Sequence, residues 1–203
     1  MLDTETPARR AWQRAGQDLG HPISDELFLR FVGRTAADSN ALIRELWGSD
    51  FPLNKLRERI TFHWLQDIAQ NPIATKPGLI ELLDYLDSVG LRKAIATSSH
   101  RHHALAKLGS LVDRFDALVT GDDVVRGKPA PDIFLLAANE LGQLPAECLV
   151  LEDSLPGIRG AQAAGIYAIM VPDLIPPDDQ VIHVAPSLLD VMAWLKSLPQ
   201  HQS

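Results

Sequence analysis

The chain has 203 residues, of which 46% are hydrophobic and 22% are charged, and its formal net charge at pH 7 is −7. This composition is ordinary for a globular protein and leaves no basic surplus to neutralise nucleic-acid phosphates, so we expect no nucleic-acid partner. We expect no membrane span, which would need roughly 20 apolar residues, and no signal peptide. Cys148 is the only cysteine, which excludes an internal disulfide and favours a cytoplasmic location.

The first third of the chain predicts helices and no strand. Apolar residues recur three or four positions apart, and Thr6-Pro7 is typical of a helix start. Four helices without a strand form a small bundle, so we expect a helical domain over residues 1–72 with a linker at 1–6. The predicted helices begin near Thr6 and cover residues 25–31, 36–47 and 53–69.

From residue 73 onward, short apolar runs alternate with amphipathic helices. The predicted strands cover residues 93–97, 117–120, 148–151 and 166–171, and the predicted helices 78–89, 102–111, 132–141, 158–164 and 188–198. This alternation predicts an α/β domain over residues 73–203, with a parallel sheet covered on both faces. Ligands bind at the carboxyl ends of such strands, so we expect Thr97-Ser98, Gly121-Asp122 and Glu152-Asp153 to meet at one rim.

The end of the first predicted strand carries hydroxyl groups, in the string Ile95-Ala96-Thr97-Ser98-Ser99. A hydroxyl donor together with the N-terminus of the following helix favours a bound anion. The same residues also serve as an ordinary helix cap, and the string by itself does not decide between the two.

Two further strings follow predicted strands. Gly127-Lys128-Pro129-Ala130-Pro131-Asp132 places a lysine in a stiff loop, where it either neutralises an anion or stays a surface charge before a helix. In Leu149-Val150-Leu151-Glu152-Asp153-Ser154, two carboxylates follow an apolar run and Gly157 comes three residues later. These carboxylates either bind a cation or cap the next helix, where negative charge suits the helix dipole.

In this order, the three strings resemble the second, third and fourth motifs of the haloacid dehalogenase superfamily, in its β-phosphoglucomutase-like and phosphatase subgroup. The resemblance implies a Rossmann-like three-layer core with a parallel sheet, plus a small all-α helical-bundle cap. It also implies Mg²⁺ as cofactor and a small phosphorylated metabolite as substrate. The implied roles are phosphate binding by Thr97, Ser98 and Lys128, with Thr97 and Lys128 also catalytic, and magnesium binding by Asp153 with support from Glu152.

In the helical segment, Val32-Gly33-Arg34-Thr35 resembles the cap loop that closes over the active site in this subgroup. Arg34 would grip a substrate oxygen or second phosphate there, although an ordinary exposed charge explains it equally well. His100, His102 and His103 suggest a metal site, but a solvated first helical turn is the better interpretation because no matching ligand set accompanies them.

Family members normally carry a strand ending in Asp-x-Asp-Gly shortly before a stretch like Leu2-Asp3-Thr4-Glu5. Its first aspartate attacks phosphorus and its second protonates the leaving oxygen. We expect this segment and its central strand to be missing ahead of Met1, through a start site placed too late, a truncation or a decayed gene. The predicted function is a Mg²⁺-dependent phosphatase acting through an aspartyl-phosphate, as a monomer or weak dimer. The alternatives are a phosphomutase, a dehalogenase and a catalytically inactive fragment.

Overall fold

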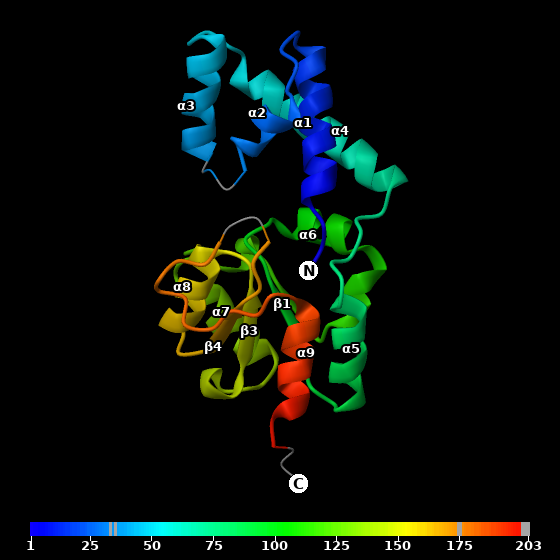
Figure 1. Cartoon of the computed structure of the whole chain (residues 1–203), viewed down its shortest axis with the longest axis vertical. Coiled ribbons are helices and arrows are strands. Elements are labelled where there is room, and N and C mark those ends of the chain that lie inside the picture. The colour runs from blue at the N-terminus through cyan, green and yellow to red at the C-terminus, as the bar shows by residue number, and fades with distance from the viewer. Residues whose placement is uncertain (33, 35, 174–175, 200–203) are drawn as a thin grey trace. The chain divides into compact units, whose positions relative to one another are not determined.

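The computed structural model describes residues 1–32, 34, 36–173 and 176–199, and the chain forms two compact units (Figure 1). One unit comprises Leu2–Ala74, and the other comprises Met1 with Thr75–Ser203. The division therefore lies two residues beyond the end of the helical domain predicted over residues 1–72, and Met1 belongs to the second unit. Every helix among the described residues is too short or too polar to cross a bilayer.

The first unit is helical, drawn from blue to cyan in Figure 1. Its helices are α1 (Glu5–Asp18), α2 (Asp25–Leu29), α3 (Ala36–Trp47) and α4 (Leu53–Gln70). The Ser24 hydroxyl caps α2 by accepting from the Leu27 amide at 3.2 Å. The aromatic rings of Trp12 and Phe31 stack with centroids 4.6 Å apart. The buried core of this unit comprises Ala15, Phe31, Leu42, Ile43, Phe51 and Leu56.

One buried ion pair fixes α1 against α4. Asp67 on α4 has only 2% of its surface exposed, and it accepts two hydrogen bonds from Arg10 Nε, both 3.1 Å long. Arg10 Nη2 adds a third bond of 2.7 Å. A guanidinium fork matches a carboxylate in this way, so the pair sets the register of the two helices as well as joining them.

The second unit alternates strands with helices. Its α-helices are α5 (Leu79–Ser88), α6 (Arg101–Leu108), α7 (Asp132–Glu140), α8 (Leu155–Ala163) and α9 (Leu188–Ser197). Its strands are β1 (Ala94–Ala96), β2 (Ala117–Val119), β3 (Leu149–Glu152) and β4 (Tyr167–Met170). Three short 3₁₀ helices lie between them, η1 (Gly109–Arg114), η2 (Gly121–Asp123) and η3 (Pro145–Glu147).

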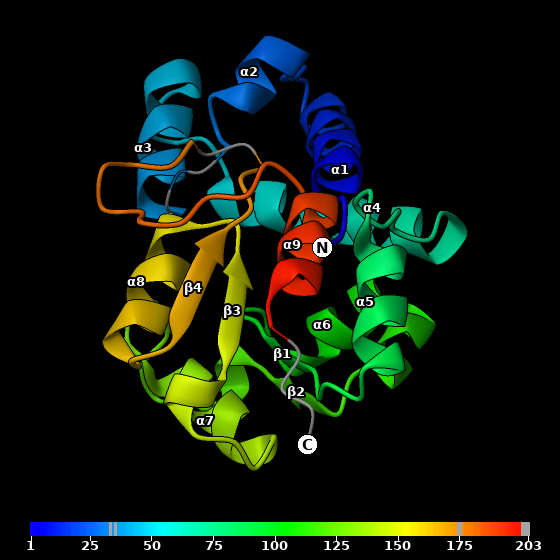
Figure 2. The ribbon, with the colours of Figure 1, turned by 60° about the horizontal axis from the view of Figure 1, so that its bottom comes forward.

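The strands are parallel, as the sequence predicts, and they form two pairs (Figure 2). In one pair Ile95 of β1 lies opposite Leu118 of β2. In the other pair Val150 of β3 lies opposite Ala168 of β4. No strand joins the two pairs within the described residues, so the central strand expected from the family resemblance stays a prediction.

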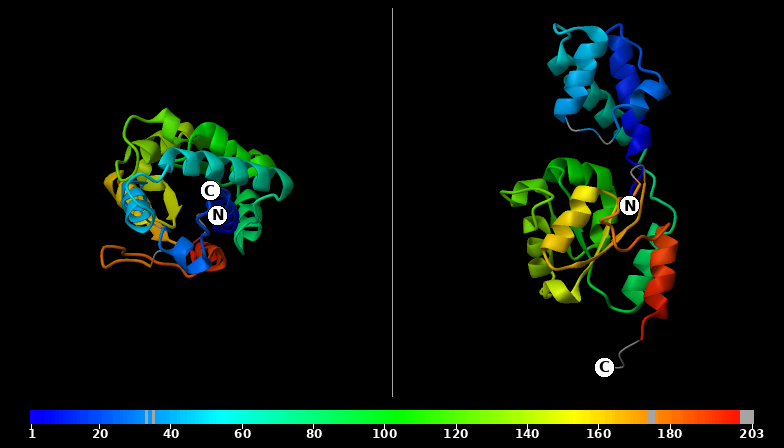
Figure 3. Two further views of the ribbon diagram at one scale, coloured as in Figure 1. Left: turned by 90° about the horizontal axis from the view of Figure 1, so that it is seen from above. Right: turned by 60° about the vertical axis from the view of Figure 1, so that its left-hand side comes forward.

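Helices cover both faces of these strands. Val150 and Ala168 pack toward the core formed with α7 and α8, which contains Ile133, Phe134 and Ala161. Leu151, the next residue along β3, packs instead toward the leucines of α5 and α9. Alternate residues of a strand point to opposite faces, so both sides of β3 are covered by helices. Figure 3 shows α9 in red beside α5 in green.

Two helix boundaries differ from the sequence prediction by three residues. Helix α8 begins at Leu155 instead of residue 158, because the Ser154 hydroxyl accepts from the Gly157 amide at 3.2 Å and Pro156 fits the first turn. Helix α6 ends at Leu108 instead of residue 111. Gly109 there takes a positive φ of 52°, and the chain continues as the 3₁₀ helix η1.

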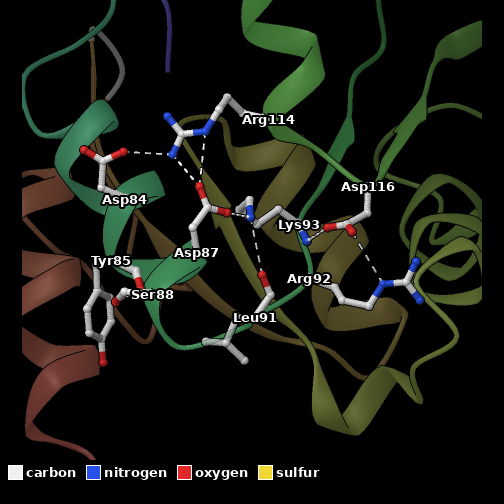
Figure 4. Close-up of polar contacts among 9 residues, drawn as sticks. All are labelled: Asp84, Tyr85, Asp87, Ser88, Leu91, Arg92, Lys93, Arg114 and Asp116. Atoms are coloured by element: carbon white, nitrogen blue, oxygen red, sulfur yellow. Dashed lines mark hydrogen bonds and ion pairs between the residues drawn. The ribbon is translucent and has the colours of Figure 1, made fainter.

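A cluster of charged residues fixes the entry into β1 (Figure 4). Arg114 donates to Asp84 at 2.9 Å and to Asp87, and the Lys93 ammonium also contacts Asp87. The Lys93 amide donates to the Asp116 carboxylate at 2.7 Å, just before the first pair of opposed residues in β1 and β2. The network therefore connects the end of α5 to the starts of both strands.

Candidate functional site

An ion pair between Lys128 and Glu152 lies at the carboxyl ends of the strands. Lys128 comes from the loop before α7, and Glu152 is the last residue of β3. Their side chains are only 11% and 8% exposed. The Lys128 ammonium also donates to the Ala96 carbonyl at the end of β1, at 3.2 Å, and lies 4.9 Å from the Phe134 ring centroid. One cation thus connects the end of β1 to the end of β3.

The Glu152 carboxylate is held by the start of α8 as well as by Lys128. Its Oε2 accepts from the amides of Asp153 at 2.9 Å and Ser154 at 3.1 Å, and from the Ser154 hydroxyl at 3.0 Å. Burial acts to raise the pKa of Glu152, but the Lys128 ammonium and these donors outweigh it, so the pKa is lowered. Glu152 is therefore an ionised and fixed side chain.

Gly157 provides the space that this carboxylate occupies. A Cβ atom built on Gly157 would lie 2.1 Å from the Glu152 carboxyl carbon and from one of its oxygens. Real Cβ atoms do not approach so closely, so any larger residue here would displace Glu152. The glycine three residues after Ser154 thus has a steric role that is specific to this site.

Asp153 differs from its neighbour, because it keeps part of its surface open to solvent and forms no ion pair with a lysine or arginine among the described residues. Desolvation by the surrounding protein, followed by the negative charge of Glu152, raises the pKa of Asp153. A cation beside Asp153 would relieve both effects. Of the two predicted magnesium ligands, Asp153 is the one that no lysine or arginine side chain pairs with among the described residues, although the positive amino group of Met1 acts to lower its pKa.

The described residues contain no group of three or more acidic, histidine or cysteine side chains arranged around one metal position. Mg²⁺ keeps several waters and uses one or two carboxylates together with substrate phosphate. Asp153, with Glu152 behind it, is a donor set of this kind.

The loop after β1 presents hydroxyl groups near the same strand ends. The Thr97 amide donates to the Val119 carbonyl at 3.0 Å, which continues the pairing of β1 with β2. Thr97 Oγ1 accepts from the Ser99 amide at 3.2 Å. Since its oxygen already accepts, the Thr97 hydroxyl is left to donate its own hydrogen, as phosphate binding requires.

Two residues from other elements fix this loop. Lys107, which the sequence analysis did not single out, lies two helical turns into α6 and donates to Ser99 Oγ at 3.2 Å, and burial lowers its pKa. Gly121, expected at the same rim, donates its amide to the Ser99 carbonyl at 3.0 Å, and a Cβ there would lie 2.6 Å from the Ser98 carbonyl oxygen. Lys107 carries no local sequence signal, because its role depends on a contact between elements that are distant in the chain.

Other predicted residues lie apart from Lys128 and Glu152. The Asp122 carboxylate accepts from the Arg101 amide at 2.7 Å and contacts His100 Nδ1 at 2.5 Å, so it caps the start of α6. The rings of His102 and His103 have centroids 3.9 Å apart, and both lie beside His100. These histidines form no metal-ligand group among the described residues.

Arg34, the predicted substrate residue, belongs to the helical unit. It is exposed, and its Nε donates to the Arg30 carbonyl at 2.6 Å. Gly33 and Thr35, its neighbours in the predicted cap loop, lie outside the described residues. The role of Arg34 in substrate binding stays a prediction.

The assembled site combines donors and a cation with an open carboxylate. Thr97 supplies a hydroxyl, Lys128 an ammonium in a largely buried setting, and Asp153 a carboxylate that pairs with no lysine or arginine among the described residues. A dianionic group can bind Thr97 and Lys128 while a divalent cation binds Asp153. This combination suits a phosphate group accompanied by a metal ion.

Known proteins resemble this chain over most of its length. A family model described as hydrolase, haloacid dehalogenase-like hydrolase, matches residues 1–165. Protein CbbY of Rhodobacter capsulatus is 36% identical over 183 residues, which cover 85% of this chain and 81% of that protein. A Thermotoga maritima protein named phosphorylated carbohydrates phosphatase is 30% identical over 171 residues, which cover 83% of this chain and 79% of that protein.

The fold is shared as well. A crystal structure of a candidate β-phosphoglucomutase from Thermotoga maritima superposes with a TM-score of 0.83 at 26% identity, covering 98% of this chain and 95% of the other. The architecture is therefore the HAD-like α/β core with parallel strands, accompanied by a helical unit. The chain belongs to the haloacid dehalogenase-like hydrolase family.

Proposed function

We propose that this protein is a Mg²⁺-dependent phosphatase of small phosphorylated metabolites such as sugar phosphates. The observation that carries the proposal is the contrast between two adjacent carboxylates, Glu152 paired with Lys128 and Asp153 left open beside it. Phosphate chemistry needs a cation that binds the phosphate and a carboxylate that binds the metal. Glu152 holds the cation, Lys128, and Asp153 is the carboxylate available to the metal. The name of the Thermotoga maritima relative, which refers to phosphorylated carbohydrates, supports the substrate class.

Lys128 has the capacity to bind phosphate without releasing Glu152. An ammonium has three donors, and two of them are used by Ala96 and Glu152. The third is available to a phosphoryl oxygen. Because the lysine is largely buried, its charge acts in a low dielectric, where it stabilises negative charge developing on phosphorus more strongly than in water.

Thr97 and Ser98 would hold the phosphoryl group from the other side. The Thr97 hydroxyl donates while its oxygen accepts from Ser99, and the close packing of Gly121 on Ser98 fixes the loop. Such a fixed donor needs little rearrangement when the phosphate arrives, which is the advantage of a preorganised site.

Asp153 would hold Mg²⁺, and Glu152 would fix Lys128 and support the metal site. When bound, the ion would supply positive charge to the phosphate oxygens. The attacking aspartate that the family resemblance implies is not among the site residues described above, so the aspartyl-phosphate route stays a prediction. The residues of this chain contribute binding, orientation and charge neutralisation.

Release of inorganic phosphate from a panel of sugar phosphates tests the proposal. The assay uses the chain with Mg²⁺ and with a chelator, and also the protein translated from any upstream in-frame start. We expect turnover that requires Mg²⁺ and that Lys128→Met and Asp153→Asn each lower by about 10²-fold or more. Arg126→Met is the matched control, because this neighbouring cation is exposed and pairs with Asp132.

Absence of phosphate release from every substrate by both proteins would contradict the phosphatase proposal. Phosphate release that persists in chelator would contradict the metal role. If the 203-residue chain released no phosphate and a longer protein did, this chain would be an inactive fragment of a phosphatase.

A phosphomutase is the second candidate, because the structural neighbour with a TM-score of 0.83 is described as a candidate β-phosphoglucomutase. A mutase returns the phosphoryl group to the sugar, whereas a phosphatase transfers it to water. Analysis of the products separates the two, since a mutase yields an isomeric sugar phosphate and a phosphatase yields inorganic phosphate.

A further inference from the structure

The helical unit carries a hollow of about 680 Å³ that the proposed phosphatase site does not use. It lies between the end of α3 and the start of α4. Its lining includes three cationic side chains, Arg44 from the last turn of α3 and Lys55 and Arg57 from the start of α4. Phe51, only 8% exposed, contributes an apolar surface.

The charge of this hollow is opposite to that of the whole protein. Its three cations are accompanied by a single lining carboxylate, Glu58, whereas the chain as a whole has a net charge of −7. Most lysines and arginines in the described part of the chain lie within reach of an acidic side chain. Arg44 and Lys55 have no such partner among the described residues. The hollow is therefore lined by cationic side chains that no acidic side chain neutralises among the described residues.

Arg57 is held in place across the hollow. Its Nη2 donates to the Asn40 side-chain oxygen of α3 at 2.8 Å. A guanidinium has five N–H donors, so this single bond fixes the group while leaving other donors free. The side chain is thus positioned without being neutralised.

The start of α4 adds unmatched positive charge to the same place. Its first turn contains no acidic residue, and Pro52 at the N-cap supplies no side-chain hydrogen bond. The amides of Asn54 and Lys55 donate to no acceptor among the described residues. A helix N-terminus carries a partial positive charge that usually attracts acidic side chains. Lys55 and Arg57 beside it are electrostatically unfavourable unless an anion is present.

We propose that this hollow binds the phosphate group of a small molecule. Two guanidinium groups, an ammonium and two uncapped amides match a tetrahedral dianion in charge and in donor number. The Phe51 surface would contact an apolar face of the remainder of the ligand. The inference does not depend on the phosphatase proposal, because the hollow and the lysine–carboxylate site belong to different units of the chain.

The hollow is also separate from the predicted substrate residue Arg34. Arg34 precedes α3, whereas Arg44 lies in the last turn of the same helix. Arg34 is not among the residues that line the hollow, so the proposed site is a second one within the helical unit.

Titration of the ¹⁵N-labelled full chain with inorganic phosphate, followed by amide NMR at constant ionic strength, tests the proposal. We expect the Asn54 and Lys55 amide signals to shift and to saturate below about 10 mM phosphate. The double variant Arg44→Ala/Arg57→Ala should weaken this binding at least about tenfold. Lys55→Gln, a single exposed change, repeats the test if the double variant alters the fold. Arg9→Ala is the control, since Arg9 is exposed and lies on α1.

Two further arms identify the ligand and the site. Lys128→Met should leave the Asn54 and Lys55 titrations unchanged, because it acts on the other unit. Glucose 6-phosphate that saturates at a lower concentration than inorganic phosphate would support a contact with Phe51, and equal saturation would support recognition of the phosphate group alone. Shifts that do not saturate, or that persist in the double variant and in Lys55→Gln, would overturn the proposal.

Discussion

Lys128 and Glu152 form an ion pair in which both side chains are largely buried, and the same lysine donates to the Ala96 carbonyl. The lysine thereby connects β1 to β3, two strands that share no hydrogen bond in the described structure. Burying two charges has a large desolvation cost, which their attraction and their further hydrogen bonds offset. Removal of one partner leaves the other charge buried without compensation.

Lys128→Met should therefore lower the free energy of unfolding by about 3 kcal/mol, because the Glu152 carboxylate loses its counter-charge. Urea unfolding followed by circular dichroism measures the change. The double variant Lys128→Met/Glu152→Gln should recover at least half of the loss, since the uncompensated charge is gone. Arg126→Met, which removes an exposed cation from the same loop, should change stability by less than about 0.5 kcal/mol.

Equal losses for the single and double variants would contradict this explanation. That result would mean that Lys128 contributes through packing on Phe134 and through its bond to Ala96, and not by compensating Glu152.

Gly157→Ala should destabilise the second unit by about 2 kcal/mol, a typical cost of overpacking. The new Cβ would lie 2.1 Å from the Glu152 carboxyl carbon, which Lys128 and Ser154 hold in place. Gly127→Ala is the matched control, because a Cβ there meets nothing within 4 Å. Urea unfolding compares the two. A cost for Gly157→Ala no larger than that of the control would show that the Glu152 side chain moves aside freely.

Much of this fold could be predicted from the sequence, because long amphipathic patterns report which face of a helix is buried. Helix α3 has the bounds that the spacing predicts, and α4 and α7 differ by one residue at their ends. The order of strands and helices also follows from the pattern. The residue register within each strand pair could not be predicted, because it depends on neighbours distant in the chain.

The residues of the candidate site also divide into those that the sequence indicated and those that it did not. Lys128, Glu152 and Asp153 stand in local strings that indicate their chemistry. Gly121 is expected at the same rim from its place after a strand, whereas Lys107 has no local signal, since it acts on the loop after β1 from another element. Sequence also could not distinguish the two adjacent carboxylates, whose difference arises from the position of the Lys128 ammonium in space.

Asp67→Asn in the helical unit should lower the free energy of unfolding by about 2 kcal/mol, because Arg10 would lose a charged and largely buried partner. Arg9→Ala is the control on the adjacent residue. Its pair with Asp25 is long, at 3.5 Å, and both side chains are well exposed, so the change should cost less than about 0.5 kcal/mol. Thermal unfolding of both variants compares the two pairs. Similar losses would contradict the importance of burial.

Asp153→Asn should stabilise the metal-free protein at pH 7. Desolvation and the Glu152 charge raise the pKa of Asp153 above its ordinary value of 3.8, so the folded state binds this proton more tightly than the unfolded state. The folded protein therefore loses stability as the pH rises from 3.8 through the raised pKa, and above it the cost is complete. The advantage of Asn should be present at pH 7 and disappear below pH 3.8, as measured by urea unfolding across this range.

The same variant separates that cost from the proposed metal role. Mg²⁺ at ten times its dissociation constant should stabilise the native sequence by about 1.4 kcal/mol and Asp153→Asn much less. Ca²⁺-free and Mg²⁺-free baselines are measured in chelator, and choline chloride matches the ionic strength. If Mg²⁺ stabilised both proteins equally, the ion would bind elsewhere, and the raised pKa of Asp153 would reflect its surroundings and not a site that awaits a cation. If only the native sequence responded, a carboxylate that weakens the metal-free fold would be the group that gains from the metal.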